Sequence, residues 1–258
     1  MVDRASSEPF YGGDGLVGVL FVHGFTGSPA SLRPWAEQTA QAGYRVAVPL
    51  LPGHGTRWQD LAATGWRDWY DRVDRELTAL TQRCERVFLA SLSMGGALTL
   101  RAAELRPADV AGAILVNPAL TARNPLAGAA GLLKHAVRST KAIANDAVRE
   151  IDEGAYDRVP TAAVHQMLQL WGETRPYLDL VQAPLLIFRS ATDHVVPPSS
   201  VQIIRRQVSS LQVTEHVLTQ SFHVATLDND APFIVSETLA FLERHGAGPG
   251  PGSGPEAR

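Results

Sequence analysis

Short apolar runs alternate with longer segments of helical periodicity through most of this 258-residue chain. The runs have the length of strands, whereas the longer segments carry apolar residues at helical spacing. Uninterrupted apolar runs predict strands that are buried on both faces, as in a parallel sheet covered by helices. We therefore expect an α/β fold with a mostly parallel sheet. The predicted strands are residues 16–22, 46–51, 87–90, 113–116, 185–188 and 213–218, and the predicted helices are 34–42, 66–81, 94–105, 161–170, 199–208 and 232–244.

The interval after residue 117 breaks this alternation. Residues 118–180 separate two predicted strands, whereas a connection between a strand and a helix in this class normally takes only a few residues. We expect this interval, called here the cap segment, to form a small helical cap inserted into a single domain of residues 1–245. Residues 246–258 are dominated by Gly and Pro and are expected to be a flexible tail, because they bury too little apolar surface to order themselves.

The charge balance argues against a nucleic-acid partner. The chain has 23 basic and 26 acidic residues, a formal net charge of -3 and no run of basic residues. No segment has the apolar length needed to span a bilayer, and the first residues lack the apolar core of a secretion signal. We expect a soluble, cytoplasmic protein without stable membrane insertion, whose oligomeric state the sequence leaves open. The one cysteine, Cys84, excludes an intrachain disulfide and is expected to be a structural thiol.

The segment 87–96, VFLASLSMGG, predicts a strand that turns sharply through Ser93 into a helix. Gly95 and Gly96 remove side-chain bulk where the helix approaches the strand. This is the context of the nucleophile elbow, G-x-S-x-G, in which one tight turn exposes a serine Oγ and directs backbone N–H groups at a developing oxyanion. Ser91 stands where the pattern has its first glycine, so the motif is incomplete. A serine is small enough to be tolerated there, and Ser93 is the candidate nucleophile.

A serine hydroxyl becomes a nucleophile at neutral pH when an imidazole takes its proton and a carboxylate orients that imidazole. Asp193 and His223 each follow a predicted strand downstream of Ser93, in the chain order that an α/β-hydrolase arrangement requires. Either residue alone would more simply be a turn or surface residue. Together they favour a catalytic triad of Ser93, Asp193 and His223. His194 is assigned no role, because its side chain should point away from that of Asp193.

Two backbone N–H groups are candidates for an oxyanion hole. One belongs to Met94, the residue after the nucleophile, and the other to Phe25, in a loop that follows the strand 16–22. Gly24 permits the bend that would turn the Phe25 N–H toward the site. His23 is expected to anchor this loop by hydrogen bonding, and His54 is expected to be structural.

Five short motifs carry a resemblance to a known family: residues 23–27 (HGFTG), 53–55 (GHG), 92–96 (LSMGG), 193–197 (DHVVP) and 223–228 (HVATLD). Together they resemble the bacterial carboxylesterase and monoacylglycerol lipase group of α/β-hydrolases, over about residues 16–243. The resemblance implies a serine hydrolase of short- to medium-chain acyl esters or monoacylglycerols, with a small helical cap and the triad named above. In the monoacylglycerol lipases of this group a cap glutamate approaches the glycerol head group. Glu153 is similar in placement, so the resemblance implies a substrate-binding role for it.

An acyl-enzyme formed on Ser93 requires neither a metal ion nor an organic cofactor. The apolar residues of the cap segment suit an acyl chain, although they would equally serve to hold the cap to the core: Leu126, Leu132, Leu133, Ile143, Val164, Met167, Leu168 and Leu170. Two alternatives stay open. The same residues would also serve a thioester, lactone or carbon-carbon hydrolase, because a triad does not choose its substrate. A non-catalytic ligand-binding protein is less favoured, because all three triad residues are present.

Overall fold

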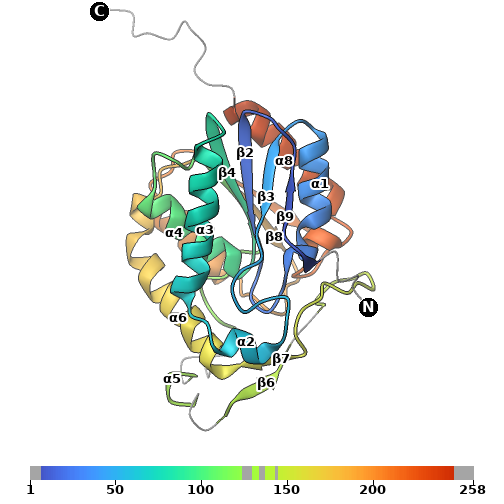
Figure 1. The fold of residues 1–258 in the computed structure, drawn as a ribbon, viewed down its shortest axis with the longest axis vertical. Helices are drawn as coiled ribbons and strands as arrows, with labels where there is room; N and C mark the ends of the chain where they lie inside the picture. The colour runs from blue at the N-terminus through green and yellow to red at the C-terminus, as the bar shows by residue number, and fades with distance from the viewer. Residues whose placement is uncertain (1–6, 124–129, 134–136, 143–144, 247–258) are drawn as a thin grey trace, which may run out of the picture.

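A seven-stranded sheet forms the centre of the computed structural model, which describes residues 7–123, 130–133, 137–142 and 145–246 (Figure 1). The strand order is β1-β3-β2-β4-β5-β8-β9. Only the edge pair β1 and β3 is antiparallel, so the carboxyl ends of the other strands meet at one edge of the sheet. The strands are β1 (Phe10–Gly12), β2 (Val17–Val22), β3 (Arg45–Val48), β4 (Arg86–Leu92), β5 (Gly112–Val116), β8 (Leu185–Ser190) and β9 (Val213–Leu218).

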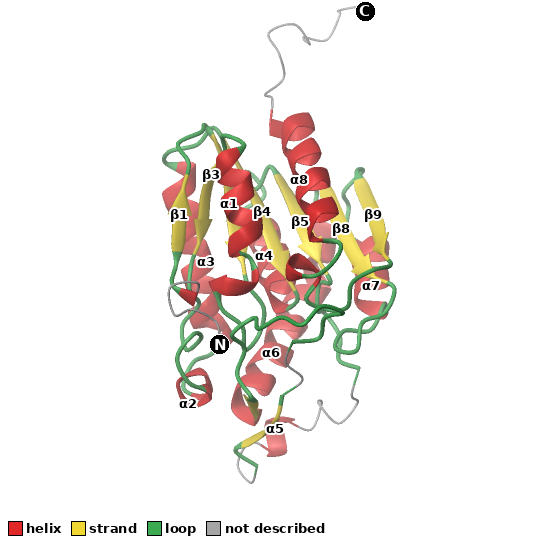
Figure 2. Ribbon diagram, turned by 90° about the vertical axis from the view of Figure 1, so that its right-hand side faces the viewer, coloured by secondary structure: helices red, strands yellow, loops and turns green. Residues whose placement is uncertain are grey.

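Helices cover both faces of this sheet. One face is covered by α1 (Arg33–Gln41) and α8 (Ala231–Gly246), which lie in front of the strands in Figure 2. The other face is covered by α3 (Trp66–Thr81), α4 (Met94–Leu105) and α7 (Ser199–Gln207). The central strands β4 and β5 are therefore buried on both sides, which explains their continuous apolar sequence. The predicted α/β class with a mostly parallel sheet is confirmed.

The observed boundaries follow the predicted ones closely. The helices α3 and α4 have the predicted bounds, whereas the strand expected at 46–51 is β3 and ends at Val48. Pro49 follows it and has no N–H with which to continue a ladder. The strand β4 extends to Leu92, so Ser91 belongs to the sheet. The short antiparallel strand β1 and the helix α2 (Trp58–Ala62) were not predicted.

The cap segment lies beyond the carboxyl ends of the parallel strands (Figures 1 and 2). Its described part contains α5 (Ala130–Leu133), β6 (Ser139–Lys141), β7 (Arg158–Pro160), α6 (Thr161–Thr174) and the 3₁₀ helix η4 (Arg175–Leu180). The strands β6 and β7 pair as a small antiparallel sheet. The sequence predicted a helical cap and did not predict this sheet. Within the described residues no helix has both the length and the apolar character to cross a membrane. Residues 124–129 and 143–144 and the expected tail beyond Gly246 lie outside the described residues.

Candidate active site

Ser93 connects β4 to α4 in a conformation that side chains rarely adopt. Its φ is 56° and its ψ is -121°, and a positive φ is strained for any residue other than glycine. Two glycines make room for this turn. A β-carbon on Gly95 would lie 2.1 Å from the carbonyl oxygen of Val22, and one on Gly96 would lie 2.7 Å from Cβ of Pro118. The structure thus contains a sharp strand-to-helix turn at Ser93, which is 9% exposed.

Ser91 occupies the position of the missing first glycine and lies wholly inside the sheet. It pairs with Val22 on one side and Leu115 on the other in the parallel ladders. Its Oγ donates a hydrogen bond to the carbonyl oxygen of Ile114 at 3.4 Å, so its hydroxyl has a partner although it is fully buried. A β-carbon on Gly96 would still lie 3.9 Å from this Oγ, which is ordinary contact. The sheet therefore accommodates the side chain without closing the space next to the helix.

Asp193 and His223 form a buried hydrogen-bonded pair. Nδ1 of His223 donates to Oδ2 of Asp193 at 2.8 Å, and the two side chains are 9% and 8% exposed for His223 and Asp193. Oδ1 of Asp193 accepts the backbone N–H groups of Val195 and Val196 at 2.8 and 2.7 Å. Burial raises the pKa of the Asp193 carboxyl, but the hydrogen bond and charge of His223, with the two backbone donors, outweigh it and lower the pKa. The carboxylate therefore stays ionised and fixes the imidazole, leaving its Nε2 to accept a proton.

Four of the predicted site residues line one pocket of about 390 Å³: Ser93, His223, Phe25 and Glu153. Asp193 adjoins this pocket through His223. The cap segment supplies much of the apolar wall, with Val159, Val164, Met167 and Trp171. Of the other apolar cap residues, Leu170 is buried in the core and Leu132 is 85% exposed, while Leu126 and Ile143 lie outside the described residues.

The loop after β2 passes directly against Ser93. A β-carbon on Gly24 would lie 3.2 Å from Cβ of Ser93 and 3.8 Å from its Oγ. The backbone N–H groups of Phe25 and Met94 make no hydrogen bond within the part of the chain that the structure describes. Both groups therefore keep their donor capacity for a bound molecule.

His23 holds this loop through both ring nitrogens. Its Nδ1 donates to the carbonyl oxygen of Gly24 at 3.0 Å, and its Nε2 accepts the backbone N–H of Leu51 at 3.1 Å. Burial lowers the pKa of His23 to about 4, and the bond to Gly24 opposes this only in part. The ring is therefore neutral at neutral pH and acts as an anchor, as the sequence predicted.

His54 packs behind His23, with ring centroids 5.0 Å apart, and against Trp69 at 5.7 Å. Its Nδ1 donates to the carbonyl oxygen of Pro52 at 3.1 Å. Burial and the neighbouring His23 lower the pKa of His54 to about 3, so it is a neutral core residue. It does not line the pocket that holds Ser93.

Glu153 extends from the cap segment into the same pocket as His223 and is half-buried. Its carboxylate accepts the backbone N–H of Asn145 at 3.1 Å, and its own N–H donates to Oδ1 of Asn145 at 3.1 Å. Burial raises the pKa of the Glu153 carboxyl, although the Asn145 N–H and the nearby His223 oppose the shift. Glu153 and His223 thus line one pocket, with the Glu153 carboxylate held by the backbone of Asn145.

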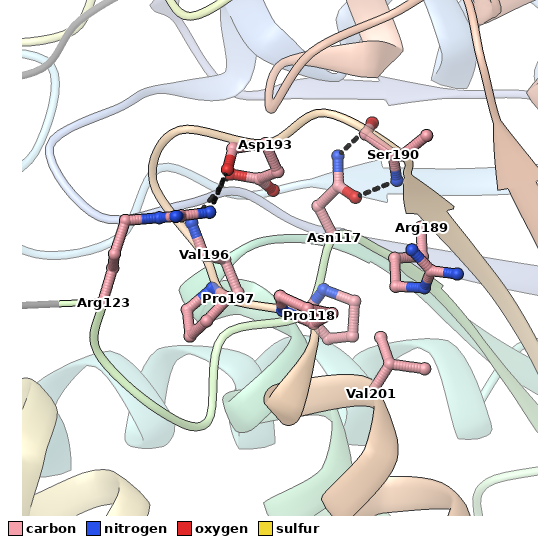
Figure 3. A pocket seen from close by; sticks show the side chains of 11 residues that line it. Asn117, Pro118, Arg123, Arg189, Ser190, Asp193, Val196, Pro197 and Val201 are labelled. Atoms are coloured by element: carbon pink, nitrogen blue, oxygen red, sulfur yellow. Dashed lines mark hydrogen bonds between the residues drawn. The ribbon is translucent and has the colours of Figure 1, made fainter.

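Sequence reasoning missed Asn117, a polar residue directly after the buried strand β5. Its Nδ2 donates to Oγ of Ser190 at 2.9 Å and to the carbonyl oxygen of His223 at 2.8 Å, and its Oδ1 accepts the N–H of Ser190 at 2.7 Å. Figure 3 shows the two bonds between Asn117 and Ser190 among the residues that line a small pocket of about 40 Å³, where Arg123 donates to the Asp193 carbonyl oxygen. Asn117 thereby ties the ends of β5 and β8 to the loop of His223. Its place directly after a buried strand is the one feature visible in the sequence, and that place is equally typical of a turn residue.

No group of three or more His, Cys, Asp or Glu side chains suited to a metal ion occurs among the residues that the structure describes. The chemistry on which the site can draw is that of a serine, an oriented imidazole and two backbone donors, next to an apolar-walled pocket.

Comparisons with known proteins agree with this geometry. The sequence profile of a family described as serine aminopeptidase, S33 (Hydrolase_4) matches residues 17–230. The chain is 42% identical over 244 residues to a thermostable monoacylglycerol lipase of Bacillus sp., covering 93% of this chain and 96% of that protein. It is 26% identical over 238 residues to a carboxylesterase of Bacillus subtilis, covering 91% of this chain and 95% of that protein.

Solved structures show the same architecture. A chain from a study of two metagenome-derived lipolytic enzymes superposes with a TM-score of 0.90 at 38% identity, covering 93% of this chain and 98% of that chain. A monoacylglycerol lipase of Paleococcus ferrophilus superposes with a TM-score of 0.79 at 19% identity, covering 92% and 98%, a likeness of fold alone. The profile match and the 42% identical relative show that the chain belongs to the Hydrolase_4 family of α/β-hydrolases.

Proposed function

We propose that the chain hydrolyses carboxylic esters through an acyl-enzyme on Ser93, with short- to medium-chain acyl esters or monoacylglycerols as substrates. The observation that carries this proposal is the 2.8 Å bond between His223 and Asp193, together with a strained Ser93 that lines the same apolar-walled pocket as His223. The relatives support an ester substrate, since one is a monoacylglycerol lipase and another a carboxylesterase. In this reading the protein is a carboxylic ester hydrolase.

The reaction has two halves. Nε2 of His223 accepts the Ser93 hydroxyl proton as Oγ attacks the acyl carbon, and the Phe25 and Met94 N–H groups stabilise the oxyanion. The imidazolium, held by Asp193, then gives its proton to the departing alcohol as the ester bond breaks. A water molecule then attacks the acyl-enzyme and gives a proton to His223, and His223 returns that proton to Oγ of Ser93 as the carboxylic acid leaves. Every proton that Ser93 or water loses thus passes through one imidazole.

Glu153 is the candidate for recognising the alcohol part of the substrate. Its carboxylate accepts hydrogen bonds, so it suits the hydroxyl groups of a glycerol head group. The acyl chain would then occupy the apolar wall of the cap segment, formed in part by Val164 and Met167. This division of the pocket favours a substrate with one acyl chain over a triacylglycerol, and we interpret residues 118–180 as the cap that selects it.

The proposal is tested with p-nitrophenyl esters of increasing acyl length and with monoacylglycerols, using Ser93→Ala as the control. We expect turnover by the wild-type chain and its loss in Ser93→Ala, together with loss of fluorophosphonate labelling. Equal turnover by Ser93→Ala would contradict the assignment of the nucleophile. Matched thioesters and oxoesters form a further arm, since a strong preference for thioesters would move the chain to another class of hydrolase.

The role of Glu153 has its own test. Replacing Glu153 with Ala should raise KM for monoacylglycerols and leave KM for p-nitrophenyl esters of the same acyl chain unchanged, because only the former carry glycerol hydroxyls. Asp157, an exposed carboxylate of the same segment, provides the matched Asp157→Ala control. An equal effect of Glu153→Ala on both substrates would show that Glu153 does not recognise the head group.

A further inference from the structure

The carboxylate of Asp146, in the cap segment, lies between the loops that carry the acid and the base. Its Oδ2 accepts the backbone N–H of His223 at 3.2 Å and that of His194 at 3.1 Å. Its Oδ1 pairs with Nδ1 of His194 at 2.7 Å. His194 directly follows Asp193, so one carboxylate bonds to both loops of the acid–base pair. The side chain of Asp146 is 9% exposed, in contrast to 55% for His194.

The backbone of residues 146–149, in the cap segment, makes further hydrogen bonds to the loop that carries His223. The N–H of Val224 donates to the carbonyl oxygen of Asp146 at 2.9 Å. Asp228, which is fully buried, accepts the N–H groups of Val148 and Arg149 at 2.7 and 3.1 Å and that of Phe222 at 3.2 Å. The segment 145–149 is therefore held against residues 222–228 by side chains from both sides.

Asn145, the residue before Asp146, links the contact between Asp146 and the His223 loop to the pocket residue Glu153. Asn145 adopts a φ of 55°, a conformation that Asn tolerates better than most residues, and exchanges two hydrogen bonds with Glu153. Asn145 and Asp146 are adjacent, so the segment that places Glu153 in the pocket also bonds to the backbone of His223. The candidate head-group residue and the candidate base thus share one support.

We propose that Asp146 is a positioning residue that fixes the loop of His223 relative to the loop of Asp193 from the cap segment. The inference rests on the proposed function and adds a residue outside the triad to it. Removal of the carboxylate leaves two backbone N–H groups without their acceptor, and the His223 loop moves to regain one. A displacement of about 1 Å in a proton-transferring group costs on the order of 100-fold in rate.

The chemistry of the contacts gives a specific order of variants. In Asp146→Asn the amide oxygen still accepts both backbone N–H groups, and the amide nitrogen donates to Nδ1 of a neutral His194. Asp146→Glu keeps the charge, but its extra methylene moves the carboxylate away from the two donors. Asp146→Ala removes every side-chain bond. If Asp146 acts by positioning, Asp146→Asn should be the most active variant, Asp146→Glu less active and Asp146→Ala the least active. If the negative charge itself matters, Asp146→Glu should be more active than Asp146→Asn.

The test measures kcat and KM of the full chain on p-nitrophenyl acetate and butyrate, the rate of fluorophosphonate labelling, and thermal unfolding. We expect Asp146→Ala to lose about 100-fold in kcat with KM changed less than about threefold, and to label more slowly by a similar factor. Asp146→Asn should stay within about threefold of the wild type. The exposed Asp157→Ala, on the same segment, should match the wild type throughout.

Three results would overturn the inference: wild-type kcat in Asp146→Ala, an effect confined to KM, or greater activity in Asp146→Glu than in Asp146→Asn. If Asp146→Ala does not fold, the comparison of Asn with Glu decides by itself. The wild-type and Ser93→Ala rates are measured in the same series. An inactive wild type refutes the proposed function and the positioning role with it, whereas an active wild type with unaffected Asp146 variants refutes only the positioning role.

Discussion

Replacing Gly95 with Ala tests whether close contact between α4 and β2 sets the geometry of the Ser93 turn. The new β-carbon would lie 2.1 Å from the carbonyl oxygen of Val22 and 2.9 Å from that of His23. Non-bonded contacts to carbon need about 3.5 Å, so the helix or the end of β2 must move by roughly 1.4 Å. Overpacking of this kind costs about 1–3 kcal/mol in stability, more than the ~1 kcal/mol that Ala gains over Gly in a helix. The movement separates Ser93 from the loop of Phe25.

We expect kcat/KM of Gly95→Ala to fall by about 100-fold or more, because the oxyanion donor and the nucleophile no longer lie in register. The assay combines ester turnover with the free energy of unfolding in urea. Gly172→Ala in α6 is the matched control, since a β-carbon there meets nothing within 4 Å. That variant should gain roughly 0.5–1 kcal/mol and keep its kcat. Wild-type turnover and stability in Gly95→Ala would refute the reasoning.

Three further variants test separate parts of the structure. Ser91→Gly should keep kcat within about twofold and lose roughly 1 kcal/mol of stability, measured by urea unfolding, because glycine weakens a strand interior. Asp193→Asn should lower kcat by about 10⁴-fold with little change in KM, measured on p-nitrophenyl butyrate, because an amide favours the wrong tautomer of His223. Burial raises the pKa of Glu104 from 4.5 to about 7, because the folded protein disfavours its charged form. The free energy of unfolding is therefore highest below pH 4.5, where Glu104 is neutral in both states, and this contribution is lost as the pH rises through 7. At about 1.4 kcal/mol per pKa unit this amounts to ~3 kcal/mol, and Glu104→Gln should remove it from the difference in unfolding free energy between about pH 4.5 and pH 8.

The sequence predicted those parts of the fold that depend on local pattern. The strands β2, β4, β5 and β8 are largely apolar runs, and α3 and α4 carry apolar residues at helical spacing, so these elements could be predicted from the local order of residues. The strand β1 has three residues, which is too short to show a period. The cap segment departs from expectation for a related reason, since β6 and β7 also have three residues each and are partly exposed.

The candidate site shows the same division between local and distant contacts. Ser93, Asp193 and His223 could be predicted because each follows a strand in a fixed chain order. Asn117 and Asp146 were not predicted, because their partners lie far away in the sequence: 106 residues separate Asn117 from His223, and 77 separate Asp146 from His223. A single Asn or Asp in a loop has no local pattern that distinguishes a bond across the fold from a solvated turn.

The backbone contacts of the Ser93 turn explain why the elbow pattern tolerates Ser91 in place of its first glycine but requires its second glycine, Gly95. The Ser93 N–H donates to the carbonyl oxygen of Val116 at 3.0 Å, and the Ser93 carbonyl oxygen accepts N–H groups from Gly96 at 2.9 Å and Ala119 at 3.0 Å. The bonds of Val116 and Ala119 hold the positive φ of Ser93 from the β5 side and that of Gly96 from α4, and none of them involves the side chain at position 91. At that position the side chain bonds to the carbonyl oxygen of Ile114, whereas a β-carbon at Gly95 would meet the backbone of β2 directly. The pattern therefore requires glycine where backbone meets backbone, and at position 91 it requires only a small residue whose polar atoms are satisfied.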